Sequence, residues 1–523
     1  MLGIESFMAS FKNTIQNFLT ENRGWVVLFT ALPLSFLFDK YLTLRNWIYR
    51  NFIASNKLHD KRVSAIQEQV RRWNASGREK MMCTARKPWL NMSPRTATFK
   101  KNCNQIVINL RDVLEIDTQR QIVRAEPLVD MGYITRHLLP KGWALAIQVE
   151  MEDLTVGGLC MGLGMETNCH RYGLIQETVE AYEVITADGS LVRATRTENA
   201  DLYYALPWSW GTIAFLVAVE LKIIPVKPYM RIKYIPFHSQ EEYCKKMQEL
   251  SVADDAPDFL EATVYTKDKA VIMCGEFAEV TTQEQRAKIN SINRWYKPWY
   301  YTHVEKCIET GPFEEYIPLR HYYHRYTRSI FWELRELIPF GNHTVYRYLF
   351  GWLGAPKVSF LKFTMNRGVR RKLIYKHVVQ DIVIPISVMI EAIDLFHDLF
   401  EIYPLLVFPI RIYDNGEHQG MLRKPENCTP GKNWEMFFDL GAYGIPPAVK
   451  RKEPWDGREM VRKMEKYTRD VKGYQLLYAD TFMTQEEFRE MFDHTLYDKV
   501  RKKYKAEGAF PEIYDKIKPE DWL

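Results

Sequence analysis

The sequence contains no Cys-x-x-Cys pair, although it has eight cysteines in 523 residues. Closely paired cysteines are typical of zinc sites and redox dithiols, and a regular dense set is typical of disulfide-stabilised secreted domains. The spacing here fits neither pattern, so we expect free thiols in a reducing compartment and no metal site. The cysteines are Cys83, Cys103, Cys160, Cys169, Cys244, Cys274, Cys307 and Cys428.

A strong charge imbalance is also lacking. The 71 basic and 65 acidic residues give a net charge of +6, and no long run of Lys and Arg is interleaved with aromatic residues. Nucleic-acid binding is therefore not predicted, whereas work beside an anionic membrane surface is compatible with the small excess. Low-complexity tracts and internal repeats are absent too, and the length suggests two to four folded domains.

No uninterrupted apolar run is long enough to cross a bilayer by itself. Fifteen uncharged residues lie between Arg23 and Asp39, and as a helix they would cover about 22 Å of the roughly 30 Å hydrocarbon core. Apolar flanks lengthen the segment, and Pro33 is expected to kink it. A membrane anchor or a re-entrant hairpin is favoured over a buried core helix. A cleaved signal peptide is disfavoured because no small-x-small site follows.

Basic residues are distributed unequally around this segment. Two precede it, Lys12 and Arg23, and four follow it between residues 40 and 57. Positive residues favour the cytosolic side of a membrane. The predicted topology therefore places the main body of the protein in the cytosol.

The rest of the chain alternates between helical and strand-like patterns up to about Val226. Charged and apolar residues predict a helix over Asp60–Trp73, and a short helix is expected over Met131–Pro140. Two strand-like runs are Gln105–Leu110, expected to be half of a strand pair with the residues after it, and Gln121–Glu126. A hairpin turn is predicted at Ala187–Ser190.

From Lys227 onward aromatic residues cluster, helices lengthen and prolines recur, which predicts a second, substrate-facing domain. A final segment has a strand-like run, Gly473–Ala479, and a helical pattern over Gln485–Tyr497. The predicted divisions are an anchor at 1–50, a first domain at 51–226, a second at 227–470 and a C-terminal segment at 471–523.

The densest chemical signal is the segment Asp153–Thr167, which has four glycines within eight residues. Glycine lets the backbone approach a ligand closely, so that successive N–H groups can point at a diphosphate. The spacing matches neither the G-x-G-x-x-G nor the Walker A pattern. On spacing alone a phosphate cradle and a glycine-rich turn between buried strands both stay open.

The residues that follow decide between them. The ordered series His170–Gly173, Ala181–Ser190, Asn199–Gly211 and Thr212–Pro225 resembles the FAD-binding domain of flavoproteins of the vanillyl-alcohol oxidase (PCMH) type. Within that superfamily the chain resembles the Δ24-sterol reductases of the Diminuto/seladin type. The segments that carry this resemblance are Val123–Val129, Asp153–Gly164, Tyr316–Arg325, Thr327–Glu333, Ile338–Asn342, Tyr348–Trp352 and Tyr478–Asp480.

The resemblance implies an α+β fold, with a PCMH-type FAD-binding domain of two α+β subdomains, a substrate or cap domain and an N-terminal membrane anchor helix. It implies NADPH-dependent reduction of the C24–C25 double bond of sterol intermediates in sterol biosynthesis, at the endoplasmic reticulum or Golgi membrane. The implied partners are a sterol, NADPH, membrane lipid and other enzymes of sterol biosynthesis.

The resemblance also implies which residues hold the cofactor. They are Thr155, Val156, Gly157, Gly158, Leu159, Cys160, Met161, Gly162, Leu163, Gly164, Met165, Glu166, Thr167, Gly211 and Thr212. Two departures matter: Ala214 stands where many relatives have glycine, and Cys83–Trp89 lacks the glycine and histidine of loops that bind flavin covalently. Non-covalent FAD is therefore expected, with Cys83 as the less favoured tether.

Reduction of an isolated alkene needs a proton donor opposite the flavin. The stretch from Tyr316 to Trp332 is rich in Arg, His and Tyr and has no carboxylate before Glu333. Within it, His321, Tyr323 and His324 are the predicted catalytic residues, and the arginines are candidates for the NADPH 2′-phosphate. The rival donors are Glu166, His170 and Tyr172. The candidate arginines for the NADPH 2′-phosphate are Arg320, Arg325 and Arg328. The alternative for the whole stretch is an interdomain hydrogen-bond network.

Two other functions stay open. A flavin oxidase of the aldonolactone-oxidase type would pass electrons to oxygen, but its C-terminal signature is not found. A sterol-binding or scaffold flavoprotein would retain FAD without catalysis. No separate NADP-binding Rossmann motif is present, so NADPH would approach the flavin directly.

Overall fold

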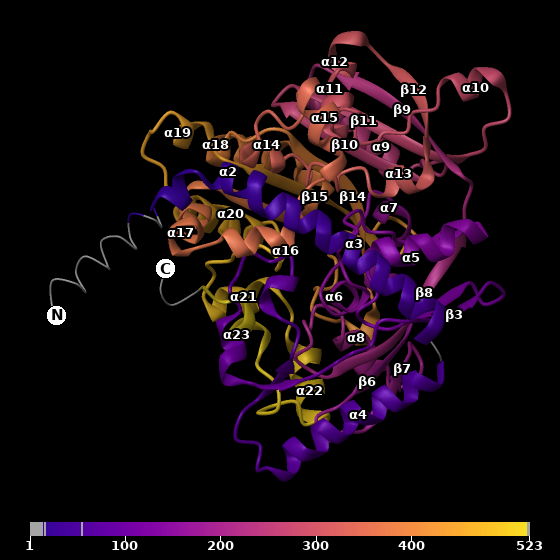
Figure 1. Ribbon diagram of the computed structural model, residues 1–523, viewed down its shortest axis with the longest axis vertical. Helices are drawn as coiled ribbons and strands as arrows, with labels where there is room; N and C mark the ends of the chain where they lie inside the picture. The colour runs from indigo at the N-terminus through magenta and orange to yellow at the C-terminus, as the bar shows by residue number, and fades with distance from the viewer. Residues whose placement is uncertain (1–13, 15–16, 54–55, 520–523) are drawn as a thin grey trace.

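The computed structural model describes residues 14, 17–53 and 56–519, and in these residues it combines helices with three β-sheets (Figure 1). The α+β class and the apolar N-terminal helix expected from the sequence are confirmed. Lys12, which contributed to the predicted topology, lies outside the described residues. All eight cysteines are free thiols.

The N-terminal segment is one helix of 31 residues, Arg23–Ile53, rather than a re-entrant hairpin. It is built from α2 (Arg23–Val26), the π-turn η1 (Val27–Ala31), α3 (Leu32–Ile48) and the π-turn η2 (Tyr49–Ile53). Pro33 lies in the first turn of α3. Because proline lacks an N–H and crowds the preceding turn, the π-turn before it accommodates the ring. The helix runs diagonally across one side of the molecule, from α14 (Leu334–Leu337) towards α5 (Figure 1).

The first domain has two sheets. The smaller is a parallel pair, β1 (Met82–Thr84) and β2 (Asn104–Ile106). The larger has the order β3-β4-β8-β6-β7, with β5 also paired to β8, and its pairs are antiparallel. Its strands are β3 (Val113–Asp117), β4 (Ile122–Ala125), β5 (Trp143–Leu145), β6 (Val179–Ile185), β7 (Leu191–Ala194) and β8 (Phe215–Pro225).

Several local predictions hold in this domain. The helix expected over Asp60–Trp73 lies within α4 (Asn56–Ala75), and that expected from Met131 is α5 (Met131–Leu138). The turn at Ala187–Ser190 joins β6 to β7. Short helices follow the strands: α6 (Val156–Met161), α7 (Cys169–Tyr172) and α8 (Ala200–Ala205).

The strand expected over Gln105–Leu110 is shorter than predicted and pairs differently. It stops at Ile106 and pairs in parallel with β1, while β3 pairs with β4. The reason is that the Gln69 side chain of α4 accepts from the Val107 N–H at 2.9 Å and donates to its carbonyl at 3.1 Å. These two bonds occupy the backbone groups that a longer strand pair would use.

The second domain is built on an eight-stranded antiparallel sheet of order β12-β9-β11-β10-β14-β15-β13-β16. Its strands are β9 (Tyr229–Phe237), β10 (Phe259–Thr266), β11 (Lys269–Ala278), β12 (Phe313–Pro318), β13 (Val378–Pro385), β14 (Leu405–Tyr413), β15 (Trp434–Gly444) and β16 (Tyr474–Gln475). One face packs on α9 (Gln240–Val252), α18 (Met389–Phe400) and α20 (Gly457–Asp470). We call the opposite face, which meets the first domain, the inner face.

Strand alternation decides which residues reach the inner face. Side chains of a strand point to opposite faces in turn. On β15, Phe438, Leu440 and Ala442 belong to the helix-covered core. Asp439, between them, is therefore directed to the inner face, as is Asp381 beside Ile382 on β13. The sheet thus presents buried acids to the first domain.

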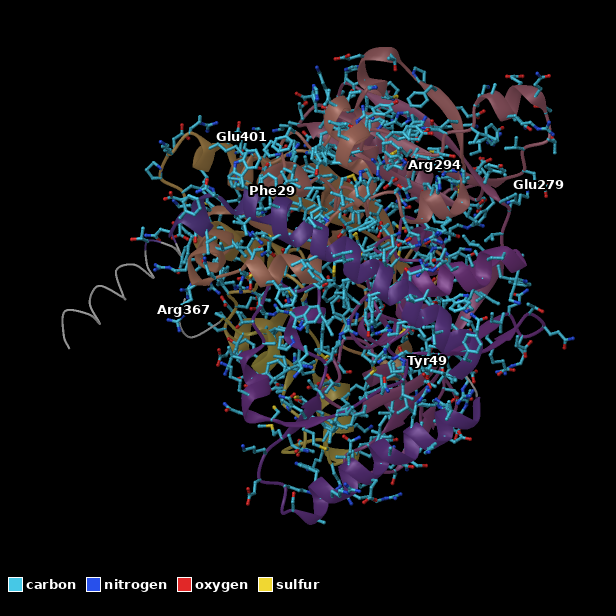
Figure 2. All side chains as sticks on the ribbon, in the orientation of Figure 1. Phe29, Tyr49, Glu279, Arg294, Arg367 and Glu401 are labelled. Atoms are coloured by element: carbon cyan, nitrogen blue, oxygen red, sulfur yellow. The ribbon has the colours of Figure 1, made fainter. Side chains whose placement is uncertain are left out.

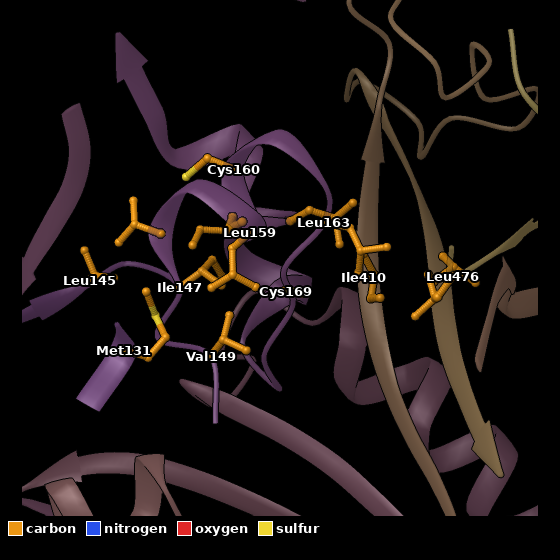
Figure 3. Close-up of a cluster of buried hydrophobic side chains, with 14 of the residues drawn as sticks. Met131, Leu145, Ile147, Val149, Leu159, Cys160, Leu163, Cys169, Ile410 and Leu476 are labelled. Carbon is orange, nitrogen blue, oxygen red and sulfur yellow. The ribbon is translucent and has the colours of Figure 1, made fainter. Parts of the chain in front are cut away.

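The glycine-rich segment packs directly on this inner face. Leu159 and Leu163 belong to the same buried cluster as Ile410 of β14 and Leu476, and Figure 3 shows Leu163 reaching towards Ile410 between the two domains. Both domains therefore share one core.

The C-terminal segment connects the two domains. The strand expected over Gly473–Ala479 is limited to β16, which pairs with β13. The helix expected over Gln485–Tyr497 is two helices, α21 (Gln485–Met491) and α22 (Thr495–Lys503), because Phe492 has an extended backbone. The chain then returns to the first domain, where Phe510 packs on Phe215 with ring centroids 5.0 Å apart. The predicted domain boundaries themselves stay a prediction.

Removing the Phe510 ring should loosen this return. Phe510→Ala deletes a fully buried ring and is expected to cost about 3–5 kcal/mol, as for other buried aromatic residues. The urea unfolding midpoint should fall accordingly. Leu191→Ala, at a side chain 48% exposed, should change the stability by less than about 0.5 kcal/mol. Equal midpoints for the two variants would contradict the packing described here.

Candidate functional site

A cavity of about 960 Å³ lies where the two domains and the N-terminal helix meet. This volume is at the upper end of the roughly 300–1,000 Å³ typical of ligand sites. Its wall includes parts of the glycine-rich segment, the loops after β1, the inner face of the second sheet, residues 358–379 and the first turn of the N-terminal helix. Segments far apart in the sequence therefore surround a single space.

Most of the predicted cofactor residues line this cavity. Those at the wall are Thr155, Gly157, Gly158, Leu159, Met161, Gly162, Leu163, Gly164, Met165 and Gly211. The other five, Val156, Cys160, Glu166, Thr167 and Thr212, are fully buried in the protein. Ala214, where relatives commonly have glycine, is also at the wall.

The glycines of the segment serve two different purposes. A Cβ on Gly157 would lie 2.6 Å from Pro127, on Gly162 2.6 Å from the Gly158 carbonyl, and on Gly164 2.8 Å from Ile175. These three are glycine because the chain packs tightly on itself. At Gly158 the nearest atom is 3.1 Å away, and Gly211, at φ +69°, has nothing within 4 Å. Only the last two leave bare backbone towards open space.

The tight loop leaves unpaired donors at the cavity wall. Among the described residues, the backbone N–H groups of Leu163, Gly164 and Met165 have no hydrogen-bond acceptor. Unpaired buried donors are rare and cost about 1–3 kcal/mol each. Successive N–H groups in a turn form a concave seat for an anion or a polar oxygen. The loop therefore fits a ligand that brings several oxygen acceptors, as a dinucleotide does.

Basic side chains lie at the same wall. They are Arg86, Arg95, Lys100 and Lys516. Lys516 reaches the wall from α23 (Ile513–Ile517) of the C-terminal segment and donates to the Trp210 carbonyl. Burial, with the nearby charge of Lys100, lowers the pKa of Lys516 to about 8. A diphosphate would compensate these charges. Their place beside the glycine-rich segment could not be predicted from the sequence, because they lie far from it along the chain.

Cys83 also reaches the wall. Hydrogen bonding with the Cys103 thiol, aided by the charges of Lys100 and Lys516, lowers the pKa of Cys83 to about 7 against the effect of burial. The thiol is therefore partly ionised at neutral pH. Because Cys83 lies at the cavity wall, it is the residue at which a covalent flavin link would be tested.

The inner face of the second sheet supplies an acid to the same cavity. Asp381 accepts a hydrogen bond from the Tyr443 hydroxyl at 2.5 Å and another from the Tyr478 hydroxyl. All three side chains line the wall. Burial raises the pKa of Asp381 to about 7, although the bond from Tyr443 opposes this rise. Asp381 can therefore hold a proton near neutral pH.

A second acid lies behind the first. Asp439 is fully buried, and neither of its carboxyl oxygens has a hydrogen-bond partner among the described residues. Burial, and then the charges of Asp381 and Glu150, raise its pKa well above the usual range. A buried carboxyl without donors is stable only when neutral. Asp439 is therefore a protonated, neutral carboxyl on the inner face, next to the cavity.

None of the three predicted catalytic residues is at the wall of this cavity. His324 is buried, with Nε2 3.1 Å from the Thr135 hydroxyl and Nδ1 2.7 Å from the Glu150 carbonyl oxygen. Burial lowers its pKa. These bonds join α13 (Leu319–Tyr323) to the first domain, so His324 positions the domains.

The other two also lie away from the cavity. Burial, with the charge of Arg294, lowers the pKa of His321 to about 4. Tyr323 is packed against Phe259, and burial raises its pKa well above the usual range. His321 is half-buried and Tyr323 fully buried, and neither side chain is at the wall of this cavity.

The arginines predicted for NADPH are similarly occupied. Arg325 is fully buried and pairs with Glu166 and Glu261, each at 3.1 Å. Arg320 pairs with Glu152 at 2.8 Å, and Arg328 donates to backbone carbonyls of residues 292, 295 and 297. The contacts of this stretch agree with the alternative that the sequence left open, an interdomain hydrogen-bond network. Its carboxylate partners come from other segments, which local composition did not reveal.

The rival donors also lie off the wall. Glu166 belongs to the Arg325 network. His170 Nε2 is 2.8 Å from the Pro257 carbonyl oxygen, and burial lowers the pKa of His170 to about 4. Tyr172 is partly buried and is not among the lining residues. Among the described acids at the wall, Asp381 is the one held by two hydroxyl donors.

Near the N-terminal helix the wall carries a group of apolar side chains, interspersed with charged ones such as Arg23, Lys362 and Lys372; we call this part the apolar end. Its lining includes Leu337, Val358, Leu361, Met365, Val369 and Leu373. The cavity wall thus combines unpaired N–H donors and basic side chains, the Asp381 carboxyl and a group of apolar side chains. Such a division suits a polar cofactor and a large apolar substrate that meet between them.

Comparison with known proteins agrees with this division. A family model described as an FAD binding domain matches residues 62–195, which include the glycine-rich segment. The chain is 45% identical over 502 residues to the Delta(24)-sterol reductase of Homo sapiens, covering 96% of this chain and 94% of the relative. It is 38% identical over 525 residues to the Delta(24)-sterol reductase of Pisum sativum, at 96% and 92% coverage. A xylooligosaccharide oxidase of Thermothelomyces thermophilus is 26% identical over only 22% of the chain.

Neutralising Lys516 should weaken FAD binding. Loss of one charge-assisted contact costs about 1.5–3 kcal/mol, so Lys516→Gln should raise the Kd of FAD at least about tenfold. Because the ammonium is the binding form, the affinity of the unchanged protein should fall as pH rises above about 8, and that of the variant should not.

Fluorescence titration of the apoprotein with FAD measures both effects. Lys503→Gln, at an exposed lysine paired with Asp201, is the matched control. Equal Kd values and equal pH profiles for Lys516→Gln and the unchanged protein would remove Lys516 from the cofactor site.

Proposed function

This chain belongs to the Delta(24)-sterol reductase family, and on that premise we propose that it reduces the C24–C25 double bond of a sterol, with NADPH as the source of electrons. FAD is its cofactor, as the matching FAD binding domain indicates. The observation that carries the proposed site is the placement of Asp381, Tyr443 and Tyr478 in the same cavity as the glycine-rich segment.

The proposed cofactor seat is the donor-rich side of the cavity. The unpaired N–H groups of residues 163–165 and the bare backbone at Gly158 and Gly211 would hold the polar part of FAD, with Lys516 opposite its negative charge. Bound there, FAD supplies the hydride that one alkene carbon needs after NADPH has supplied electrons. We propose that FAD is held non-covalently, and acid precipitation should leave the colour in the supernatant.

Asp381 is the proposed proton donor. When one alkene carbon accepts a hydride, the other must accept a proton, and an acid with a pKa near the working pH transfers it best. The carboxyl of Asp381 has such a pKa, of about 7, and lies at the wall. The hydroxyls of Tyr443 and Tyr478 hold it in place and stabilise the carboxylate that remains. Asp439 lies behind it as a reserve of protons.

The apolar end of the cavity is the proposed seat of the sterol. Its leucine, valine and methionine side chains offer no hydrogen bond to a hydrocarbon. An apolar body placed there would orient its flexible side chain towards the glycine segment and Asp381. Burial of a large apolar surface would contribute most of the binding free energy.

Membrane association is part of the proposal. The helix Arg23–Ile53 is apolar and long enough to anchor the protein, and sterol chemistry places such an enzyme at the endoplasmic reticulum, or the Golgi membrane, with its body in the cytosol. Other enzymes that act on the same lipid are the proposed neighbours. Localisation of a fluorescent fusion distinguishes the two membranes.

Anaerobic spectroscopy tests the reaction directly. NADPH added to the purified protein should bleach the flavin band, and desmosterol, a sterol with a C24–C25 double bond, should restore it. Bleaching without sterol-dependent recovery would reject the reductase. Flavin that NADPH does not bleach would favour the sterol-binding or scaffold alternative, and recovery with oxygen but not with sterol would favour the oxidase.

Asp381→Asn tests the donor. The amide cannot supply the proton, so sterol-dependent recovery of the flavin band should slow about 10²–10⁴-fold, while bleaching by NADPH should change little. In the unchanged protein the recovery rate should fall as pH rises through about 7, because the acid form is lost. The variant should lack this pH dependence.

Stopped-flow absorbance at several pH values measures both steps. Asp394→Asn, at a half-exposed carboxylate on α18, is the control and should behave like the unchanged protein. If Asp381→Asn kept the normal rate and pH profile, another group would have to donate the proton.

A further inference from the structure

Exposed large apolar side chains are concentrated in two segments of the described chain. One is the N-terminal helical region, with Phe18, Leu19, Trp25, Phe29, Leu34, Leu37, Tyr41, Leu44, Trp47, Ile48, Phe52 and Ile53. The other lies in the second domain, with Phe340, Val345, Tyr348, Leu349, Phe350, Trp352 and Phe363. Single exposed apolar residues are normal on a soluble protein, but a large group marks an interaction surface.

The two segments lie side by side. The Trp25 and Phe340 rings have centroids 5.7 Å apart, and the Phe36 and Trp352 rings 5.3 Å apart. Between them, the Ser35 hydroxyl accepts from the Lys357 N–H at 2.8 Å. Figure 1 shows α2 and α3 passing across the second-domain helices near α16 (Val358–Leu361). The exposed side chains of both segments therefore form one surface, which we call the apolar platform.

The helix is fixed to the protein along its length. Val27 and Leu32 are fully buried and Ser35 is 2% exposed. At the far end the Tyr49 hydroxyl donates to Asp112 at 3.2 Å. Figure 2 marks Phe29 and Tyr49 towards the two ends of this helix. A helix that crossed a bilayer would have to leave these contacts and place Ser35 in hydrocarbon. The docked helix instead suits an orientation parallel to a membrane surface.

The chemistry of the platform matches a lipid surface better than a protein partner. Its exposed residues include several Trp and Tyr, which concentrate at membrane–water boundaries. Beside it lies α17 (Arg367–Lys376), with five basic residues and no acidic one. Four of these, Arg367, Arg371, Lys372 and Lys376, are exposed. Aromatic residues flanked by positive charge are typical of proteins that bind anionic bilayers from one side.

The cavity extends to the inner side of the platform. The cavity wall includes residues that neighbour the platform. They are Thr20, Glu21, Arg23 and Gly24 of the helical region and Val358, Leu361 and Met365 beside it. The apolar end of the cavity is thus the end nearest to this surface. A water-insoluble ligand could pass between bilayer and cavity here without crossing water.

We propose that the apolar platform, formed jointly by the N-terminal helix and residues 340–363 of the second domain, lies on an anionic lipid bilayer, with the cavity opening at that contact. The second domain then binds lipid itself, and the helix lies along the bilayer rather than across it. The lipid-binding claim needs neither NADPH nor turnover, so it stands or falls apart from the proposed reaction.

Vesicle flotation with the full-length, FAD-loaded protein tests this proposal. The variant Leu349→Glu/Phe350→Glu places two charges on the second-domain part of the platform and leaves the helix unchanged. Binding to phosphatidylcholine/phosphatidylserine vesicles should weaken at least tenfold. The matched control, Leu191→Glu/Val252→Glu, changes two side chains 48% and 49% exposed elsewhere and should bind normally.

Two further measurements separate the alternatives. Arg371→Gln/Lys372→Gln should weaken binding to vesicles with phosphatidylserine and leave binding to pure phosphatidylcholine unchanged. Brominated phosphatidylcholine should quench tryptophan fluorescence, and Trp352→Phe should remove part of that quenching even if another variant fails to fold.

Unchanged binding of Leu349→Glu/Phe350→Glu together with unchanged quenching of Trp352→Phe would overturn the proposal, since the helix alone would then hold the protein. A loss of dimers in solution, with no loss of vesicle binding, would overturn it as well, because the platform would then be an interface between copies of the chain.

Discussion

The arrangement of the site depends on one buried cation, Arg325. Its guanidinium is shielded from water and bonds to Glu166 of the first domain and Glu261 of β10, each at 3.1 Å, and it stacks on the Tyr322 ring at 4.3 Å. Removing one partner of such a group costs about 3–5 kcal/mol, because a charge stays buried without compensation. The two domains therefore have little freedom to slide. Since Glu166 lies near the end of the glycine-rich segment, this network fixes the segment against the sheet.

The fixed contact between the glycine-rich segment and the second sheet determines which chemical groups meet at the cavity. The glycine segment supplies unpaired N–H groups on one side, and the inner face of the sheet supplies Asp381 on the other. Each feature is unfavourable alone, because unpaired donors and a desolvated carboxyl both cost free energy. Together they form a site in which a polar cofactor would compensate the donors, beside a carboxyl whose pKa is raised to about 7.

The sequence predicted the features that depend on neighbours along the chain. The glycine-rich segment, the turn at Ala187–Ser190 and the helix within α4 follow from local glycine content, turn residues and periodicity. The acid at Asp381 was out of reach, because its role depends on burial beneath hydroxyls from residues 443 and 478. The role of Lys516 could not be predicted from the sequence either, because it depends on burial at the cavity wall.

Residues 320–328 show the same limit of sequence information. Their stretch of Arg, His and Tyr looked like an unpaired cationic site because its carboxylates stand elsewhere, at Glu152, Glu166 and Glu261. The charged and polar side chains of such a stretch are available to a ligand only if no other segment packs on them. In this protein these cationic groups pair with carboxylates across the domain boundary. The acid at the cavity, Asp381, and its two hydroxyl donors come from segments with no unusual composition.

The position of the N-terminal helix connects these observations. The helix closes the apolar end of the cavity with residues of its first turn, while Lys357 bonds to Asp39 on the helix and also to Asp153 at the start of the glycine segment. One ammonium thus ties the helix, the second domain and the cofactor wall together. The same helix exposes its other side to the surroundings. The two ion pairs of Lys357 therefore hold the helix beside both the apolar end of the cavity and the glycine-rich segment.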